Sequence, residues 1–158
     1  MAEQRTLEHM LADVRQSQLD LLDILSKVDE RTLYTRPSEN EWSIAEILVH
    51  VANAREFFTV ETEKVLATPG VAMGRTIVDP ERIQYVRDHA HDPADLIARQ
   101  LVASHEHLVS LLERMHEDDL SIVGKHVKFG EQTLGEFIEH FIVEHDQAHV
   151  RQSTVLVS

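Results

Sequence analysis

Two histidines spaced four residues apart stand near the C-terminus, in the stretch EHDQAH at residues 144–149. His145 and His149 fall on the apolar stripe of a segment with helical periodicity, where leucine would be usual. Residues four apart share one face of a helix, so both imidazoles can point at a single ion. The chain has no cysteine, which leaves imidazole and carboxylate as its strong metal ligands. The pair therefore indicates a metal site, with hydrogen-bonded buried imidazoles as the alternative.

A third histidine, His50, lies seven residues after Ser43, where another helix is predicted to begin. If the two helices are antiparallel, the rise of about 1.5 Å per residue puts His50, His149 and His145 at depths of roughly 10, 12 and 18 Å from one end. The three are then nearly level. Taken alone, His50 is more typical of a core histidine whose ring nitrogens are hydrogen-bonded.

The other histidines are weaker ligand candidates. His105 and His107 are two apart, and such side chains diverge on a helix. We expect the rest at the surface: His9, His89, His91, His116, His126 and His140.

Two polar residues near the histidine pair could take part in chemistry. The order His-Asp-Gln-Ala-His resembles the zincin His-Glu-x-x-His motif with Asp146 in the position of the general base. Aspartate is one methylene shorter than glutamate, so a carboxylate that supports the ligands or lies on the helix surface is the preferred interpretation of Asp146. Gln152, one turn beyond His149, could bind a cofactor or ligand, or hydrogen-bond a backbone group.

Four long segments with helical periodicity must position these residues: about 3–28, 43–68, 93–116 and 133–157. Ser43 with Glu46 and Thr133 with Glu136 form predicted capping boxes, and Asp92 before Pro93 is a predicted N-cap. In the fourth segment the predicted buried stripe is Leu134, Ile138, Phe141, Ala148 and Val155. The pattern predicts an all-α fold, in one domain over residues 1–158.

The connections between these helices are unequal in length. About 25 residues separate the second helix from the third, with a candidate short helix at Asp79-Pro80. A connection this long can run back along a bundle, which would make the second and third helices parallel. The stretch SIVGKHVKFG, residues 121–130, has two extended pieces around Gly124, too weak a pattern to predict strands.

The charge balance limits the partners that we expect. Fifteen Lys and Arg against 28 Asp and Glu give a net charge of −13, which repels phosphates and anionic membranes. The sequence has neither a signal-peptide pattern nor an apolar run long enough for a membrane span. We therefore expect a cytoplasmic protein that binds neither nucleic acid nor membranes.

Two stretches resemble the signature of the DinB-like (YfiT-like) superfamily of metalloenzymes. RPSENEWSIAEILVHVAN, residues 36–53, has its Pro-containing loop, its Trp-Ser helix start and a histidine eight residues after the tryptophan. GEQTLGEFIEHFIVEHDQAHVRQ, residues 130–152, has its Gly-x-x-Thr-Leu helix start, its His-x-x-x-His pair and a following Gln. The resemblance implies a four-helix bundle of up-down-down-up topology that holds one divalent ion on His50, His145 and His149.

The resemblance also suggests a reaction class. Three imidazoles leave a fourth position open, as in catalytic rather than structural zinc sites. Characterised relatives include transferases and isomerases that use low-molecular-weight thiols such as bacillithiol or mycothiol. We therefore expect a zinc or nickel enzyme that transfers such a thiol to a small electrophile. A metal-dependent hydrolase and a non-catalytic metal-binding or dimerisation module are the alternatives.

A homodimer is the expected assembly. Bundles of this family commonly pair, and apolar residues extend beyond one stripe, as at Phe57 beside Phe58 and Ile142 beside Phe141.

Overall fold

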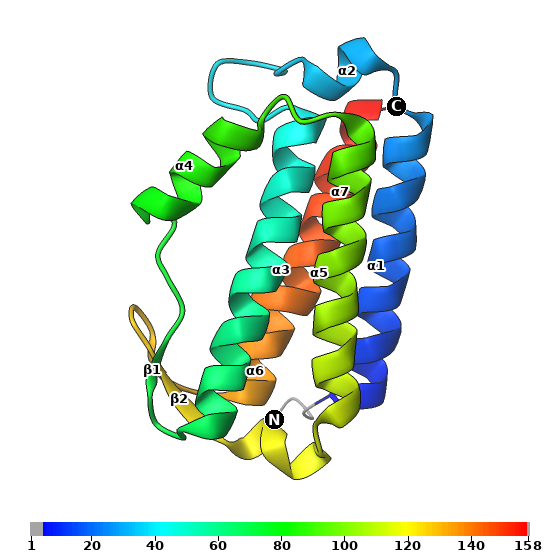
Figure 1. Cartoon of the computed structure of the whole chain (residues 1–158). Helices are drawn as coiled ribbons and strands as arrows, with labels where there is room; N and C mark the ends of the chain where they lie inside the picture. Colours follow the sequence, from blue (N-terminus) through cyan, green and yellow to red (C-terminus); the bar gives the residue numbers. More distant parts are fainter. Residues whose placement is uncertain (1–4, 158) are drawn as a thin grey trace.

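The computed structural model describes residues 5–157 and shows a bundle of four long helical arms (Figure 1). The C-terminal arm is continuous but composite, with a π-helical segment, η2, between two α-helical pieces. The arms are α1 (Leu7–Lys27), α3 (Ile44–Ala67), α5 (Ala94–Arg114) and the series α6 (Leu134–Ile138), η2 (Glu139–Glu144) and α7 (His145–Val157).

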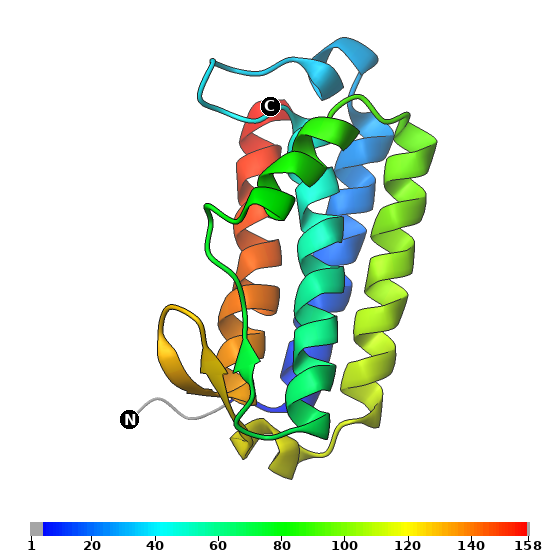
Figure 2. The ribbon, with the colours of Figure 1, turned by 60° about the vertical axis from the view of Figure 1, so that its left-hand side comes forward.

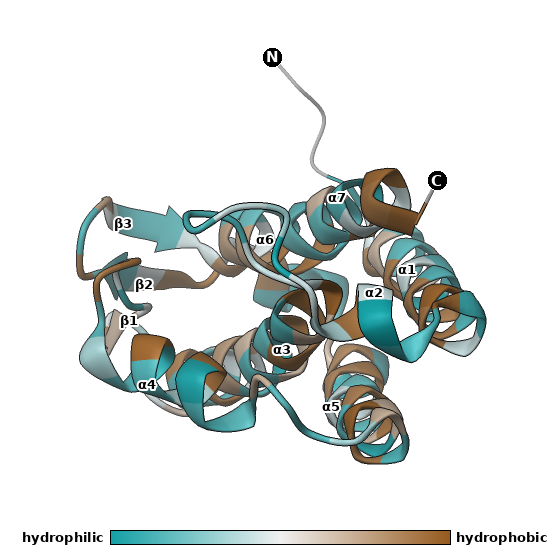
Figure 3. Ribbon diagram, turned by 90° about the horizontal axis from the view of Figure 1, so that it is seen from above, coloured by the Kyte–Doolittle hydropathy of each residue, from teal (hydrophilic) through white to brown (hydrophobic). Residues whose placement is uncertain are grey.

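The topology is up-down-down-up, as predicted. In Figures 1 and 2, α1 and the C-terminal arm run in one direction, and α3 and α5 run in the other. The parallel pair is possible because the connection from α3 to α5 returns along the bundle through β1 (Ala72–Met73) and α4 (Pro80–His89). Figure 3 shows α4 outside the four arms, next to α3.

Helix starts follow the capping residues closely. Ser43 and Glu46 form the predicted capping box at α3, and the Thr133 hydroxyl accepts from the Glu136 backbone N–H. At α5 the prediction was wrong by one residue, because Pro93 is the N-cap and Asp92 instead bonds the His89 ring at 2.7 Å. The first predicted helix begins at Leu7, and its predicted start at Glu3 lies outside the described residues.

Elements that were not predicted lie in the connections. The first connection contains a short helix, α2 (Glu30–Tyr34), and a 3-10 turn, η1 (Glu117–Ser121), follows α5. Strands β2 (Val123–His126) and β3 (Gly130–Thr133) form a hairpin, and β1 pairs with β2 in parallel. Strands of two to four residues are too short for a periodicity signal, and the β1–β2 pairing joins segments about fifty residues apart, so sequence reasoning left them as loops.

His126 was expected at the surface and is buried, with 3 % of its surface exposed. Its ring stacks on Phe141, with centroids 4.9 Å apart, and its Nδ1 accepts from the backbone N–H groups of Lys128 and Phe129. Gly74, at φ +84°, passes so close to this ring that a Cβ would lie 2.4 Å from Nε2. The hairpin turn thus satisfies one ring nitrogen of the buried imidazole, while Nε2 has no hydrogen-bond partner among the described residues.

The core consists of two apolar clusters at opposite ends of the bundle. One adjoins the sheet and is built around Met10, Leu108 and Phe137; the other adjoins α2 and is built around Leu21, Leu48 and Leu101. A layer of buried polar residues lies between them, with members from all four arms: Ser17 and Gln18, Arg55, Ser104 and Asp146.

After the π-helical segment, the C-terminal arm buries residues other than those of the predicted apolar stripe. The buried series Leu134 and Ile138 continues through Ile142, one position after the predicted Phe141. It then reaches Asp146, two positions before the predicted Ala148. Ala148 and Val155, predicted to be buried, are exposed, Val155 by 72 %. A π turn holds one more residue than an α turn, so the helix after it is rotated against the periodicity before it. Within residues 5–157, no helix is long and apolar enough to cross a membrane.

Candidate metal centre

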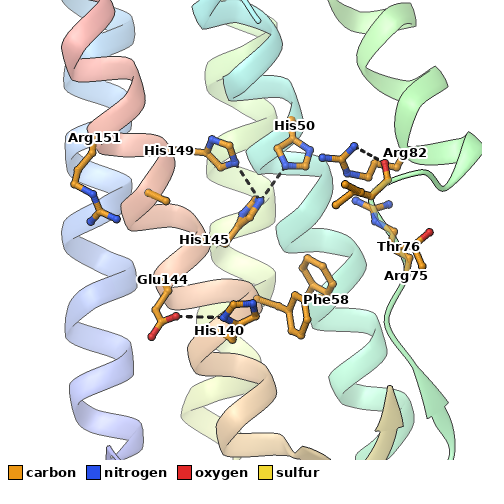
Figure 4. A pocket seen from close by; sticks show the side chains of 13 residues that line it. His50, Phe58, Arg75, Thr76, Arg82, His140, Glu144, His145, His149 and Arg151 are labelled. Atoms are coloured by element: carbon orange, nitrogen blue, oxygen red, sulfur yellow. Dashed lines mark hydrogen bonds and ion pairs between the residues drawn. The ribbon is translucent and has the colours of Figure 1, made fainter. Parts of the chain in front are cut away.

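His50 on α3 faces His145 and His149 on the first turns of α7 (Figure 4). The Nε2 atoms of His50 and His145 are 2.9 Å apart, and those of His149 and His145 are 3.2 Å apart. One nitrogen from each of the three rings lies within 4.8 Å of the others. The structure therefore brings together the three histidines that the sequence singled out.

Hydrogen bonds alone do not explain these short distances. The His145 Nε2 atom has one in-plane site, either a proton or a lone pair, so it cannot form good hydrogen bonds with both neighbours. A tetrahedral ion at about 2.05 Å from each nitrogen would hold them about 3.3 Å apart. The observed spacings of 2.9 and 3.2 Å are close to that value. The donor set fits a divalent ion.

Neighbouring side chains orient two of the rings. The Gln152 Oε1 atom lies 2.8 Å from His149 Nδ1 and accepts a hydrogen bond from its N–H, so that His149 Nε2 keeps its lone pair. Gln152 was a candidate for cofactor binding; in the structure it contacts the His149 ring at Nδ1, the nitrogen that does not face His145. The His50 ring packs against Trp42, with centroids 4.9 Å apart, and its Nδ1 has no hydrogen-bond partner among the residues described.

All three imidazoles are held in the neutral form. Burial lowers the pKa of His50 and His149 and lowers the pKa of His145 to about 3. The positive charge of Arg82 acts in the same direction on all three. Neutral imidazole is the form that binds metal ions.

The three histidines form the floor of a pocket of about 520 Å³. Its walls come from α3, the connection before α4, α4 itself and the C-terminal arm (Figure 4). Aromatic rings of Phe58 and Phe141 form part of the wall, and Arg75 and Arg82 stand on the side opposite α7. The volume suits a small organic molecule.

Sequence reasoning missed Arg75 and Arg82. The available signal was two arginines seven apart in the long connection of an acidic chain, flanking the predicted helix start at Asp79. His140, correctly expected to be exposed, lines the pocket with Glu144, and its Nδ1 lies 3.3 Å from the Glu144 carboxylate.

Asp146 points away from the pocket, into the bundle. It is fully buried, and its Oδ2 accepts from Arg55 Nε at 2.8 Å. Burial raises the pKa of the Asp146 carboxyl, and the Arg55 guanidinium opposes that change. This geometry favours the supporting role over that of a general base.

His105 and His107 lie outside the pocket. His107 bonds the carboxylates of Glu56 and Glu63, at 2.8 and 3.0 Å. His105 is partly buried on α5, and its Nδ1 lacks a partner among the described residues.

Solved structures with the same fold are available at low sequence identity. YfiT from Bacillus subtilis, described as a probable metal-dependent hydrolase with an unusual four-helix bundle topology, superposes with a TM-score of 0.83 at 14 % identity, over 99 % of this chain and 88 % of its own. A mycothiol-dependent maleylpyruvate isomerase superposes with a TM-score of 0.70 at 17 % sequence identity, and the match covers 98 % of this chain but 61 % of the isomerase chain. Among curated proteins, none matches this sequence.

A third structure corrects an expectation about partners. The colibactin self-resistance protein ClbS, solved in complex with double-stranded DNA, superposes with a TM-score of 0.74 at 12 % identity, over 98 % of this chain and 97 % of its own. Excluding nucleic acid was therefore wrong. A net charge of −13 is a sum over the whole surface and does not describe the potential where arginines gather.

The family comparison covers most of the chain. The model of the DinB superfamily matches residues 13–153, which include all three histidines, the whole of α3 and α5, and most of the first and last helical arms. The chain belongs to the DinB superfamily.

Proposed function

We propose that the protein is a metal-dependent enzyme that transfers a low-molecular-weight thiol to a small electrophile. One divalent ion, zinc or nickel, would be held by His50, His145 and His149. The observation that carries the proposal is the convergence of three neutral ring nitrogens at the floor of a pocket large enough for a small molecule.

The protein side chains have distinct roles in this proposal. The three imidazoles hold the ion, and when bound it would activate a thiol, or water, at its open position. Phe58 and Phe141 exclude water from one wall of the pocket. The absence of cysteine from the chain means that no thiolate of its own competes for the ion.

A non-catalytic module is less consistent with the site. In a structural centre a fourth protein ligand normally closes the coordination sphere. Within residues 5–157, the group of possible ligands contains three histidines and no fourth member. An open position that faces a pocket supports an enzyme.

Hydrolysis is the second candidate. It is supported by the likeness to YfiT and by Glu144 and His140, which line the pocket and could move a proton. Asp146 is unsuited to that step because it is buried behind the ligands and paired with Arg55.

The test uses cobalt-loaded protein, in which a sulfur-to-metal bond produces a charge-transfer band. Bacillithiol, mycothiol, glutathione and coenzyme A are titrated, and each mixture is assayed with monochlorobimane as electrophile. We expect a band and a metal-dependent conjugate with at least one thiol. The absence of any band, together with an esterase or amidase activity that Glu144→Gln abolishes, would favour hydrolysis. No response in either assay would favour the non-catalytic module.

The homodimer, the single domain and the cytoplasmic location remain predictions. The residues that suggested a dimer are partly used within the chain, because Ile142 is buried and Phe57 packs under the Arg75 guanidinium. A monomeric mass by light scattering at micromolar concentration would contradict the dimer.

A further inference from the structure

Two arginines line the same pocket as the three histidines without forming an ion pair. Arg75 donates to the Asn53 side chain at 3.1 Å, and Arg82 donates to the Ile77 carbonyl at 3.0 Å. Within residues 5–157, neither guanidinium has a carboxylate within 4.0 Å; Asp79, a nearby acid, is engaged as the N-cap of α4. Each guanidinium has five N–H donors, so most of the donors are free for a ligand.

Aromatic rings hold both arginines in place. The Arg75 guanidinium lies over the Phe57 ring at 4.2 Å from its centroid, and that of Arg82 lies over Trp42 at 5.5 Å. Both side chains are partly buried. A guanidinium stacked in this way loses less freedom when it binds an anion, because its plane is already fixed.

The arginines and the histidines face the same space. In Figure 4 the Arg82 side chain extends toward His50, and Arg75 lies below it on the same wall. Burial and the charge of Arg82 both lower the pKa of Arg75, so the two cations are close enough to repel each other. The carboxylates of Asp79, Glu81 and Glu61 oppose this change in pKa from a distance, without a direct ion pair to Arg75 among the described residues. A divalent ion on three neutral imidazoles would add to this local positive charge.

Two unpaired cations in a partly enclosed pocket are costly unless an anion accompanies them. In a chain of net charge −13, carboxylates could readily have neutralised them. We propose that Arg75 and Arg82 form an oxyanion subsite that binds a carboxylate or phosphate group of the small molecule on which the site acts. This inference rests on the proposed function, since it describes how the substrate or thiol is held beside the ion.

The subsite would give the reaction its orientation. Planar guanidinium groups bind carboxylate and phosphate through paired hydrogen bonds, which fix direction as well as position. A molecule with its acidic group on Arg75 and Arg82 would present its other end to the histidines on the pocket floor. Substrates without an acidic group would bind more weakly.

The single tryptophan of the chain provides a probe, because Trp42 packs against both Arg82 and His50. Trp42 fluorescence and calorimetry are followed while succinate, inorganic phosphate or uncharged succinamide is added to metal-loaded and to EDTA-treated protein. We expect saturable binding of at least one of the two anions in both forms and none of succinamide. A preference for succinate or for phosphate identifies the acidic group.

Arg75→Gln and Arg82→Gln should each weaken anion binding about tenfold or more by calorimetry, and Lys substitutions should lose less because they keep the charge. The matched control is Arg87→Gln, an exposed arginine on α4 outside the pocket, which should bind as the wild type does. Thermal unfolding of each variant checks that the fold is intact.

Several outcomes would overturn the subsite. Anion binding that needs the metal and is unchanged in both Gln variants would assign the anion to the ion alone, and would leave the proposed function intact. Equal losses in Arg87→Gln would indicate a general charge effect. A short DNA duplex that binds through Arg75 and Arg82 while the small anions do not would replace the small molecule with nucleic acid. Conversely, arginine-dependent binding that persists in a His145→Ala/His149→Ala variant lacking metal would support the subsite by itself.

Discussion

Two polar groups bridge the same pair of helices, α3 and α7, in opposite ways. His50 meets His145 and His149 on the pocket side, and Arg55 meets Asp146 inside the bundle. The charges of the inner group are paired within the protein, and Arg55 also donates to the Gln18 side chain and to the Leu101 carbonyl, so that it links all four arms. Its hydrogen bonding is incomplete, because Arg55 Nη2 and Asp146 Oδ1 have no partner among the described residues. The outer group has ring nitrogens whose lone pairs no donor among residues 5–157 satisfies well.

This difference separates a structural polar group from a binding group. A buried charge paired with its counter-charge fixes how helices pack, whereas convergent neutral lone pairs beside a pocket are suited to an ion. Because Asp146 lies between His145 and His149 in sequence, one turn of helix presents both groups, on neighbouring faces less than a third of a turn apart. The Arg55–Asp146 pair thereby fixes the rotation of α7 about its axis at which His145 and His149 face His50.

The largest expected effect is on metal content. Replacing both outer histidines of α7, in His145→Ala/His149→Ala, should lower metal affinity by orders of magnitude while the helix content is retained, because two of three ligands are lost. Metal analysis of protein purified without a histidine tag measures this. His105→Ala is the control and should keep about one ion per chain. Equal metal in the double variant and the wild type would refute the site.

Breaking the Arg55–Asp146 ion pair should lower the stability of the fold. Asp146→Ala leaves the Arg55 charge buried and unpaired, so the free energy of unfolding in urea should fall by about 3–5 kcal/mol. Replacing both partners, in Arg55→Met/Asp146→Leu, should cost much less, because no unpaired charge remains. Asp23→Ala, at an exposed ion pair with Lys27, is the control for losing a surface charge. If the double variant were as unstable as Asp146→Ala, the pairing would not be the source of the effect.

A smaller effect should arise at Gln152, which lies one turn after His149 on α7 and hydrogen-bonds its ring. Gln152→Ala removes the acceptor for His149 Nδ1 and should weaken metal binding about 10–100-fold. Gln152→Glu keeps an acceptor and should largely restore the affinity. Competition with a chromophoric chelator measures both, and Gln100→Ala on α5 is the control. Wild-type affinity in Gln152→Ala would show that the ring needs no such orientation.

The last expected effect is the pH dependence of the metal-free protein, which develops gradually over several pH units. The folded state holds the pKa of His145 at about 3, below its unfolded value of about 6.5, so the unfolded chain takes up a proton first. Stability is therefore full above pH about 6.5 and should fall as the pH drops toward 3. His145→Gln should flatten that fall in urea denaturation series, and His116→Gln, at an exposed position, should not. Identical slopes for all three proteins would contradict the burial of His145.

Much of the bundle could be predicted from the sequence. Capping residues fixed the starts of α3 and α6, since the Ser43 and Thr133 side chains accept hydrogen bonds from backbone N–H groups in the first turn of each helix. The similar depth of His50, His145 and His149 along the bundle followed from the rise per residue of a helix and from the chain direction. These features depend on residues close together in sequence or on regular geometry.

The rest required tertiary structure. A π-helical segment precedes His145 and changes the rotation of the helix after it, so the apolar periodicity did not show that Asp146 would face inward and Val155 outward. Asp146 is buried because Arg55, ninety-one residues away, neutralises it, and His126 is buried because a hairpin turn and Gly74 enclose it. Arg75 and Arg82 reach the histidines only because the connection returns along the bundle. Local sequence thus determined the helices and the three histidines proposed as ligands, while contacts between distant segments decided which polar groups are satisfied and which remain available to a ligand.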